Sequence, residues 1–345
     1  MNFKAPDVGI DLGTSETRVY VRGRGIIISE PTIVAVDSAN RRNVRAVGDE
    51  AKYLMGRTTE SLSVVCPIRD GTIVDFDMTD MLIRYFLRKA IGASWLMKPR
   101  VLVSVPTGLP AVSRKAVLEA TRVGSRAKKI YLVDKPLAAA IGSGLPFEEP
   151  TGSMVVDIGG GTTDVAIISL GGLVVSQSVA VGGTKMDEAI VNYLKREFRM
   201  LVSDRTAEDV KLDLASAMPL SEGRQVRIRG RDLLSGQATD VEFTAAQAYE
   251  ALHEPCRAIL AAIKWVLERT PPELAVDIMR NGIHLTGGGA QLFAMDQFIA
   301  TELGIPVQVA REPEDCTALG LGHLVENLAG LTNWLTDLNL DSQPE

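Results

Sequence analysis

The chain has 345 residues, of which 46% are hydrophobic, and its formal net charge is −6. This length predicts roughly two domains, and the acidic balance gives no reason to expect a nucleic-acid partner. The three cysteines and three histidines are scattered without CxxC or metal-ligand spacing, which favours free thiols in a reducing compartment over a disulfide framework or a zinc site. We expect neither a signal peptide nor a transmembrane segment, because no apolar run is long enough.

Strand and helix patterns alternate along the chain and predict an α/β protein. Strands are expected at Val8–Ile10, Ile26–Ile28, Val101–Val105, Ile130–Val133, Met154–Asp157, Val165–Ser169 and Gly282–Thr286. Helices are expected at about Thr79–Ala90, Ser113–Val123, Pro136–Ser143, Met186–Phe198, Thr244–Arg269 and Leu292–Leu303. Two stretches interrupt the alternation and are predicted to be inserted subdomains, Glu30–Asp75 and roughly Met200–Phe243.

The basic run Arg224–Arg231 lies in the second of these stretches and allows two interpretations. It is either a nucleic-acid patch or a half-exposed strand with solvated arginines. Because Val226 and Ile228 alternate with the arginines, we favour the strand.

One motif occurs twice in the chain. Val8–Tyr20 and Val155–Ile167 each consist of an apolar strand, an Asp, a tight turn of Gly, Thr or Ser, and a returning strand, which is typical of a β-hairpin. Glycines let backbone N–H groups approach anionic oxygens, hydroxyls add donors, and each Asp (Asp11 and Asp157) can hold a divalent cation or its waters. Two such hairpins facing each other would clamp a nucleotide triphosphate and its Mg²⁺ from both sides.

A third glycine cluster, Gly287–Gly289, follows a predicted strand and precedes a predicted helix. Neither this cluster nor the central one has the G-x-G-x-x-G pattern of a Rossmann fold, and the GxxxxGK[ST] pattern of a P-loop is absent. Any one such turn is more often structural than ligand-binding. Three of them, two being copies of one hairpin, favour a ligand site.

These features, in this order, resemble the bacterial actin family MreB/Mbl, the rod shape-determining proteins, within the actin–sugar kinase–heat-shock chaperone ATPase superfamily. The resemblance extends to about Leu328. Its matching stretches include Gly25–Pro31, Asp70–Phe76, Ala138–Pro146, Gly152–Leu170 and Pro271–Leu274.

The resemblance implies an actin-like α/β fold of two lobes, each with an RNase H-like core and a smaller inserted subdomain, and ATP in the cleft between them. The expected boundaries are 1–30, 75–150 and 318–345 for the lobe I core, 31–74 for its insertion, 151–184 and 244–317 for the lobe II core, and 185–243 for its insertion. It also implies self-assembly into filaments that govern cell shape and cell-wall synthesis with shape-determining membrane proteins. The expected localisation is cytoplasmic, peripheral on the inner face of the cytoplasmic membrane.

The resemblance further implies roles for single residues. Asp11 and Asp157 would hold Mg²⁺ through water, and Thr163 would lie near the attacking water. Glu208 and Lys211 fit a helix that contacts ribose and base, although a surface i,i+3 pair would explain them without the resemblance. The remaining nucleotide contacts would come from Gly13, Thr14, Ser15, Gly159, Gly160, Gly161, Thr162, Gly287, Gly288 and Gly289, and Gly182, Gly183 and Asp187 would also line the cleft.

The chain departs from the family at one catalytic position. The family has Glu-Glu-Pro where this chain has Asp134-Lys135-Pro136, and the second Glu is expected to activate the hydrolytic water. The ammonium of Lys135 accepts no proton and would attract the γ-phosphate. We therefore predict ATP binding with slow or absent hydrolysis, since losing a positioned base typically costs ~10²–10⁴-fold in rate. Asp134 is displaced by one residue and is expected to cap the following helix.

A candidate membrane contact is Trp95-Leu96-Met97, which is followed by Lys98 and Arg100. Three large apolar side chains beside two cations suit shallow insertion at an anionic surface, and the alternative is that they fold back onto the core. The last apolar residues have helical spacing and predict a docked terminal helix, namely Leu328, Leu331, Trp334, Leu335 and Leu338.

Two other protein classes share parts of this pattern. A small-molecule kinase of the sugar-kinase type would have a phosphate loop like Asp11–Arg18, but no base for a second substrate is evident and little chain remains beyond the ATP-binding core. A chaperone ATPase would need a substrate-binding domain after the nucleotide lobes, and the sequence shows none.

Overall fold

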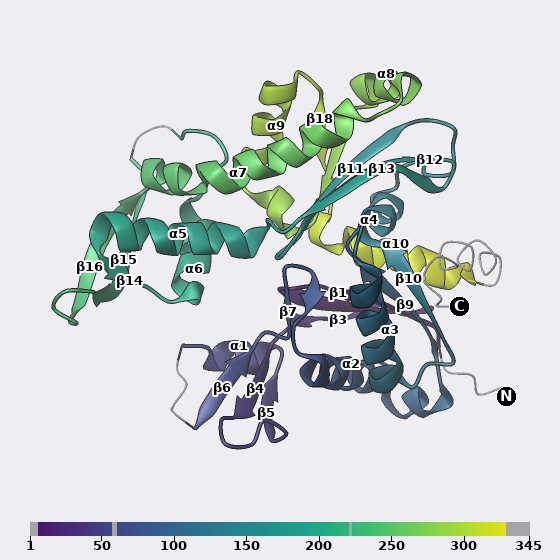
Figure 1. Cartoon of the computed structure of the whole chain (residues 1–345), viewed down its shortest axis with the longest axis horizontal. Coiled ribbons are helices and arrows are strands. Elements are labelled where there is room, and N and C mark those ends of the chain that lie inside the picture. The colour runs from purple at the N-terminus through teal and green to yellow at the C-terminus, as the bar shows by residue number, and fades with distance from the viewer. Residues whose placement is uncertain (1–5, 57–60, 221–222, 329–345) are drawn as a thin grey trace.

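The computed structural model describes residues 6–56, 61–220 and 223–328, except for the side chains of Trp95 and Leu96. It contains two lobes, each built on a five-stranded mixed sheet (Figure 1). The order in lobe I is β10 (Lys129–Asp134), β9 (Arg100–Val105), β1 (Val8–Leu12), β2 (Glu16–Val21) and β3 (Gly25–Pro31). The order in lobe II is β18 (Val307–Val309), β17 (Ile283–Thr286), β11 (Ser153–Ile158), β12 (Thr163–Ser169) and β13 (Gly172–Val179). The predicted α/β class is confirmed.

The two sheets repeat the same topology. In each, the first strand pairs antiparallel with the second, the second antiparallel with the third, and the first parallel with a later strand that pairs parallel with another. The duplicated motif therefore belongs to a larger structural repeat. Each copy forms the predicted hairpin, with Asp11 paired to Arg18 and Asp157 paired to Asp164 in the same register.

Helices cover the outer face of each sheet because their apolar side chains form one stripe. In lobe I these are α2 (Phe76–Ile91) and α3 (Ala111–Ser125), and Asp75 begins α2 by accepting a hydrogen bond from the Met78 amide (3.1 Å). In lobe II, α7 (Ala245–Glu268) begins at a capping box formed by Thr244 and Gln247. The other helices on this lobe are α5 (Gly183–Phe198), α8 (Pro272–Asn281) and α9 (Met295–Leu303).

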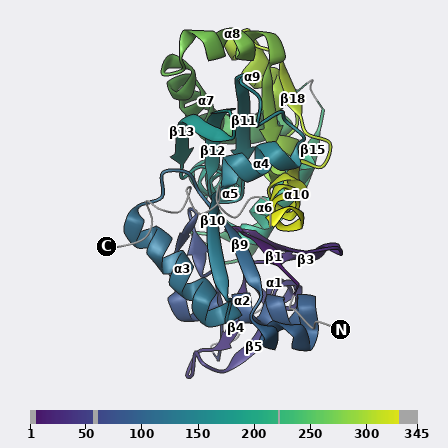
Figure 2. The ribbon, with the colours of Figure 1, turned by 90° about the vertical axis from the view of Figure 1, so that its right-hand side faces the viewer.

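A third core lies between the lobes. It is formed by α4 (Lys135–Gly142) and α10 (Cys316–Glu326), which lie between the two sheets (Figure 2). Their buried side chains pack against side chains of both sheets. The two helices touch backbone to backbone, because a Cβ atom at Gly142 would overlap the Cys316 carbonyl oxygen and one at Gly320 would overlap the Ala138 carbonyl oxygen. Only glycine allows this approach.

The predicted insertions contain small sheets of their own. Residues 31–74 contain β4 (Val34–Asp37), β5 (Val44–Val47), β6 (Leu62–Val65), the short pair β7 (Ile68–Arg69) and β8 (Thr72–Ile73), and helix α1 (Asp49–Leu54). Residues 185–243 contain most of α5, helix α6 (Asp204–Leu214) and a sheet of β14 (Met200–Leu201), β15 (Gln225–Asp232) and β16 (Ala238–Thr244). Both insertions lie on the left in Figure 1.

Strand β15 confirms the strand interpretation of the basic run. Ile228 is buried, whereas the arginines on the opposite face are exposed. Arg227 and Arg229 form ion pairs with Asp240 on β16 (2.6 and 2.8 Å). Their charge is therefore partly neutralised within the sheet.

Some elements differ from the predictions. The sequence patterns gave no helix at α8 or α10, and the predicted helix Leu292–Leu303 begins at Met295 after a 3₁₀ turn, Gly288–Gln291. Two further 3₁₀ turns are Gly92–Met97 and Pro313–Asp315. Of the predicted terminal helix, only Leu328 lies within the described residues, and it is buried. No helix in the described part of the chain is long and apolar enough to cross a bilayer.

The contact between α4 and α10 predicts an unusual response to alanine. Alanine in a helix normally gains up to ~1 kcal/mol over glycine, but at Gly320 the added Cβ would overlap a carbonyl oxygen. We expect Gly320→Ala to lower the free energy of unfolding by ~1–3 kcal/mol, as overpacking does, measured by denaturant unfolding. The control is Gly172→Ala, whose Cβ would meet nothing closer than the Ser169 oxygen at 3.9 Å. Unchanged or increased stability of Gly320→Ala would contradict the contact.

Candidate functional site

The turns of the two repeated hairpins face each other. A Cβ atom at Gly160 would overlap the hydroxyl of Ser15, and one at Gly161 would overlap the hydroxyl of Thr14. Each turn is closed by the same bond, from Gly13 N–H to Glu16 O (3.1 Å) and from Gly159 N–H to Thr162 O (2.8 Å). The structure thus brings together the glycines and hydroxyls that were predicted to surround phosphate oxygens from two sides.

A further turn of lobe I closes in on both hairpins. The Gly71 N–H donates to the Thr14 hydroxyl (3.1 Å). A Cβ atom at Gly71 would lie 2.8 Å from Cγ2 of Thr162, in the opposite lobe. Gly71 was matched to the family in sequence but was given no role, and its backbone N–H holds the Thr14 hydroxyl in place.

Lys135 lies where three buried carboxylates converge. Its Nζ is 3.1 Å from Oδ1 of Asp11, and the two side chains are only 12% and 9% exposed. The Ser104 hydroxyl donates to the same Asp11 oxygen (2.6 Å). Burial alone would lower the pKa of the Lys135 ammonium, but the charges of Asp11, Asp157 and Asp164 outweigh it and raise that pKa. Lys135 is therefore a charged ammonium inside the site.

The lobe II carboxylates of this cluster are stabilised by hydrogen bonds. Asp157 accepts from the Thr286 hydroxyl (3.0 Å), and burial raises its pKa to about 7, although Lys135 opposes that shift. Asp164 accepts from the Thr162 hydroxyl (2.9 Å) and from the Thr107 N–H of lobe I (2.9 Å). Burial also raises the pKa of Asp164, so the folded protein resists having all these carboxylates charged at once.

The side chains do not match a ready metal site at Asp11. One oxygen of its carboxylate already accepts contacts from Lys135 and Ser104. Within the described residues, no three or more His, Cys, Asp or Glu side chains are grouped to hold a metal ion. A divalent cation between Asp11 and Asp157 would have to displace the ammonium or share its place. The metal roles of Asp11 and Asp157 stay predictions.

Asp134 does not act as predicted. It occupies the N-cap position of α4, but its side chain accepts no hydrogen bond from that helix. Its carboxylate instead forms an ion pair with Arg114 of α3 (3.1 Å). The capping prediction is wrong because the nearby guanidinium offers a charged partner, which binds a carboxylate more strongly than a neutral amide does.

The second hairpin turn also contacts the start of α5. The Gly183 N–H donates to Gly159 O (3.0 Å), and a Cβ atom at Gly182 would overlap that same oxygen. Thr163 is fully buried and donates its hydroxyl proton to Val181 O (2.7 Å). Its role beside an attacking water stays a prediction, and in this structure the hydroxyl fixes the segment that leads into α5.

Glu208 and Lys211 on α6 do not pair with each other. Glu208 pairs with Lys52 of α1, in the other insertion (3.0 Å), and Lys211 pairs with Asp187 of α5 (2.7 Å). Lys211 also donates to Gly183 O (3.2 Å). The surface-pair interpretation is therefore wrong, and the two side chains reach toward the lobe interface and the second hairpin turn.

The third glycine cluster packs against the second hairpin. Cβ atoms at Gly287 and Gly289 would overlap atoms of Ile158, at the end of β11, whereas a Cβ at Gly288 would meet nothing within 4 Å. Gly287 has a φ of +80°, which favours glycine. The cluster thus adjoins the phosphate turns and leaves one open backbone position at Gly288.

Besides Gly71, four residues of this site had no role in the sequence analysis, although two of them lie beside predicted residues. Asp164 is the register partner of Asp157 and Thr286 lies in the strand next to it. The others are Ser104, near the end of β9, and Thr107, which follows β9, the parallel neighbour of β1. Only their position at the carboxyl ends of parallel strands, where such sheets bind ligands, could have indicated them.

The candidate membrane segment ends the 3₁₀ turn Gly92–Met97. The Met97 side chain is 39% exposed and Lys98 is exposed, while the side chains of Trp95 and Leu96 lie outside the described residues. Arg100 is not a free cation, because its guanidinium forms a two-point ion pair with buried Asp7 (2.8 and 2.5 Å). The prediction of two cations beside this segment is therefore wrong for Arg100.

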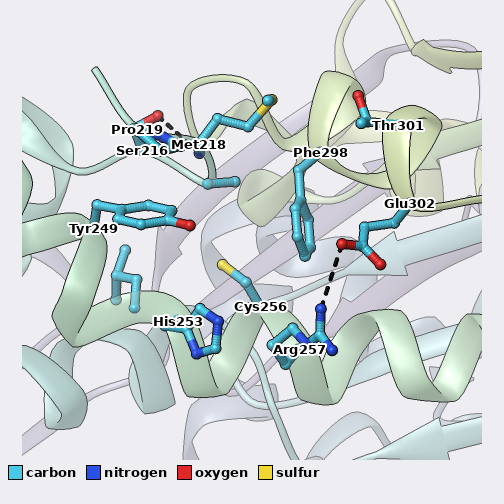
Figure 3. A pocket seen from close by; sticks show the side chains of 12 residues that line it. Ser216, Met218, Pro219, Tyr249, His253, Cys256, Arg257, Phe298, Thr301 and Glu302 are labelled. Carbon is cyan, nitrogen blue, oxygen red and sulfur yellow. Dashed lines mark hydrogen bonds and ion pairs between the residues drawn. The ribbon is translucent and has the colours of Figure 1, made fainter. Parts of the chain in front are cut away.

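A separate cavity of about 230 Å³ lies between α7 and α9 (Figure 3). Its rim is closed by an ion pair between Arg257 and Glu302 (3.4 Å), and Cys256 and Phe298 lie inside. None of the predicted site residues lines it.

The sequence is similar to that of known proteins. A family model described as MreB/Mbl protein matches residues 5–333. The chain is 44% identical over 324 residues to the cell shape-determining protein Mbl of Bacillus subtilis (strain 168), covering 94% of this chain and 97% of that protein. It is also 44% identical over 324 residues to the cell shape-determining protein MreB of Escherichia coli (strain K12), covering 93% of each.

Solved structures of similar fold include members of the same family. MreB5 of Spiroplasma citri bound to ADP has a TM-score of 0.89 at 31% identity, covering 96% of this chain and 99% of that one. The structure of MreB 5 of Spiroplasma citri bound to AMPPNP has a TM-score of 0.89 at 32% identity. The match covers 95% of this chain and 98% of that one. The MamK double helical filament has a TM-score of 0.76 at 21% identity, and the match covers 93% of this chain and 98% of that one. At this identity the likeness shows a common fold and nothing further. The predicted actin-like fold is confirmed, and the chain belongs to the MreB/Mbl family of bacterial actins.

Proposed function

We propose that this chain is an ATP-binding cytoskeletal protein that polymerises into filaments on the inner face of the cytoplasmic membrane. The filaments would govern cell shape and organise cell-wall synthesis through shape-determining membrane proteins. Family membership supports this role, since relatives 44% identical to this chain are named for determining cell shape. The localisation proposed is cytoplasmic and peripheral to the membrane.

The proposal of ATP binding is supported by the two hairpin turns, which face each other. Ser15 and Thr14 face Gly160 and Gly161 across the lobes, so amide and hydroxyl donors converge from two sides on one place. Such clusters of N–H and O–H groups bind phosphate oxygens. A relative of the same fold is solved with ADP and with AMPPNP, which supports a nucleotide as the ligand.

Slow hydrolysis is proposed from the groups that flank this place. Lys135 is an ammonium bound to Asp11 and has no lone pair to accept a proton from water. The neighbouring Asp134 is paired with Arg114 (3.1 Å) and is therefore directed elsewhere. Neither residue is placed to activate a water molecule as a general base.

Pelleting combined with phosphate release tests this proposal. We expect the wild-type protein to pellet with ATP while releasing little phosphate, and Lys135→Glu to release phosphate ~10²-fold faster or more, because a carboxylate restores a positioned base. Lys128 is exposed and directly precedes β10, whose other end leads into Lys135, so Lys128→Glu is a control with the same change of charge. Release by the wild type at the rate of Lys135→Glu would contradict slow hydrolysis, and absence of ATP-dependent pelleting would contradict the filament.

Membrane contact is proposed at Trp95-Leu96-Met97, supported by the exposure of Met97 and Lys98. Burying one large apolar side chain is worth ~1.5–3 kcal/mol, so a single molecule would bind weakly and a filament more tightly through avidity. We expect the triple variant Trp95→Ser, Leu96→Ser, Met97→Ser to lose co-sedimentation with phosphatidylglycerol vesicles in ATP. The control Leu170→Ser, at a side chain 70% exposed in another turn, should still co-sediment. Equal binding of both variants would contradict this contact.

Lys211, which is proposed to contact ribose and base, forms an ion pair with the half-buried Asp187 (2.7 Å). Burial raises the pKa of Asp187 to about 6, although Lys211 lowers it. The unfolded value is about 3.9, so the stability contributed by this group is present below about pH 4 and is lost as the pH rises to about 6.

In the nucleotide-free protein, we expect the carboxyl carbon of Asp187 to titrate by NMR with a midpoint of about 6. Lys211→Met should move that midpoint upward, because it removes the adjacent positive charge. Lys195→Met, at an exposed position of the same helix as Asp187, should leave it unchanged. A midpoint near the ordinary value for Asp, about 3.9, would contradict the burial of this carboxyl.

A further inference from the structure

Lys135 occupies the position at which a bound cation is expected. The prediction for the family places Mg²⁺ beside Asp11 and Asp157, and this structure places an ammonium 3.1 Å from Oδ1 of Asp11. The charge of Asp157 also acts on that ammonium. A role for Lys135 in balancing the charge of bound phosphates rests on the proposed nucleotide-binding function of this chain.

The fold holds Lys135 firmly at this place. It is the first residue of α4 and follows β10 directly, so the end of the lobe I sheet fixes its backbone. The side chain is only 12% exposed. Pro136, the next residue, is buried and fixes the direction of the first helical turn. The side chain therefore extends toward Asp11 rather than into solvent.

The ammonium has the chemistry for this task. It is a compact positive charge with three N–H donors. Among the residues that the structure describes, Asp11 alone offers it a carboxylate oxygen within ion-pair distance. Charge-assisted hydrogen bonds from such a group to phosphate oxygens are short and strong. The hairpin turns supply neutral donors, whereas Lys135 supplies positive charge.

We propose that Lys135 is a built-in cation that takes the place of Mg²⁺ between Asp11 and the bound polyphosphate, so that this chain binds ATP with little dependence on divalent metal. The contacts of Asp11 agree with this arrangement. Its Oδ1 accepts from the Lys135 ammonium (3.1 Å) and from the Ser104 hydroxyl (2.6 Å), so that oxygen already has a cationic partner.

The dissociation constant for ATP, measured by equilibrium dialysis with excess EDTA and with excess MgCl₂, tests the proposal. For the wild type and the control Lys128→Glu, we expect the two values to agree within about threefold. For Lys135→Glu, removal of Mg²⁺ should weaken binding ~30-fold or more, because the carboxylates then face the phosphates without a positive charge.

The outcomes separate this inference from the function on which it rests. If wild-type binding of ATP also weakens ~30-fold or more in EDTA, the inference is wrong and ATP binding stands. If the wild type binds no ATP in either solution, nucleotide binding itself is contradicted. If Lys135→Glu binds ATP equally in both solutions, the ammonium does not replace the metal.

A second measurement uses the metal alone and the nucleotide-free protein. MgCl₂ should not change the midpoint of thermal unfolding of the wild type or of Lys135→Arg, which keeps the positive charge. It should raise the midpoint of Lys135→Gln, in which Asp11 lacks its cation, because a ligand that binds only the folded state stabilises it. Equal stabilisation of the wild type and Lys135→Gln would overturn the proposal, even if the Glu variant fails to fold.

Discussion

The close contact between α4 and α10 is the constraint on which the two-lobed arrangement depends. The two helices form a core that side chains from both sheets enter, and Gly142 and Gly320 allow their backbones to touch. Because the glycines face carbonyl oxygens directly, this junction tolerates almost no added volume. The same helix α4 starts at Lys135, so the packing that joins the lobes also fixes the residue that distinguishes this site.

The site is organised by buried charge as much as by glycine. Asp11, Asp157 and Asp164 are each 7% exposed or less, and buried carboxylates are costly unless they are paired and hydrogen-bonded. Hydroxyls of threonine and serine satisfy their oxygens, and one ammonium supplies the opposite charge. A protein with a glutamate at position 135 would hold a further negative charge here and would need an external cation to balance it.

Local sequence patterns predicted the hairpins and their turns because each motif contains its own turn residues and strand periodicity. They failed where the partner is distant in sequence. Glu208 and Lys211 are spaced as a helical pair, yet their partners are Lys52 and Asp187. Helix α10 was missed because it is buried on nearly all sides and contains glycine, so it has no amphipathic stripe to detect. The chemistry of Lys135 was predictable from its charge, but its contact with Asp11 required the fold.

The ion pair between Lys52 and Glu208 connects the two insertions weakly. It joins α1 of one insertion to α6 of the other (3.0 Å), and its side chains are 39% and 33% exposed. Pairs this accessible to solvent contribute at most ~1 kcal/mol and are screened by salt. The far ends of the lobes are therefore held together only weakly by this pair, and its contribution falls further as the ionic strength rises.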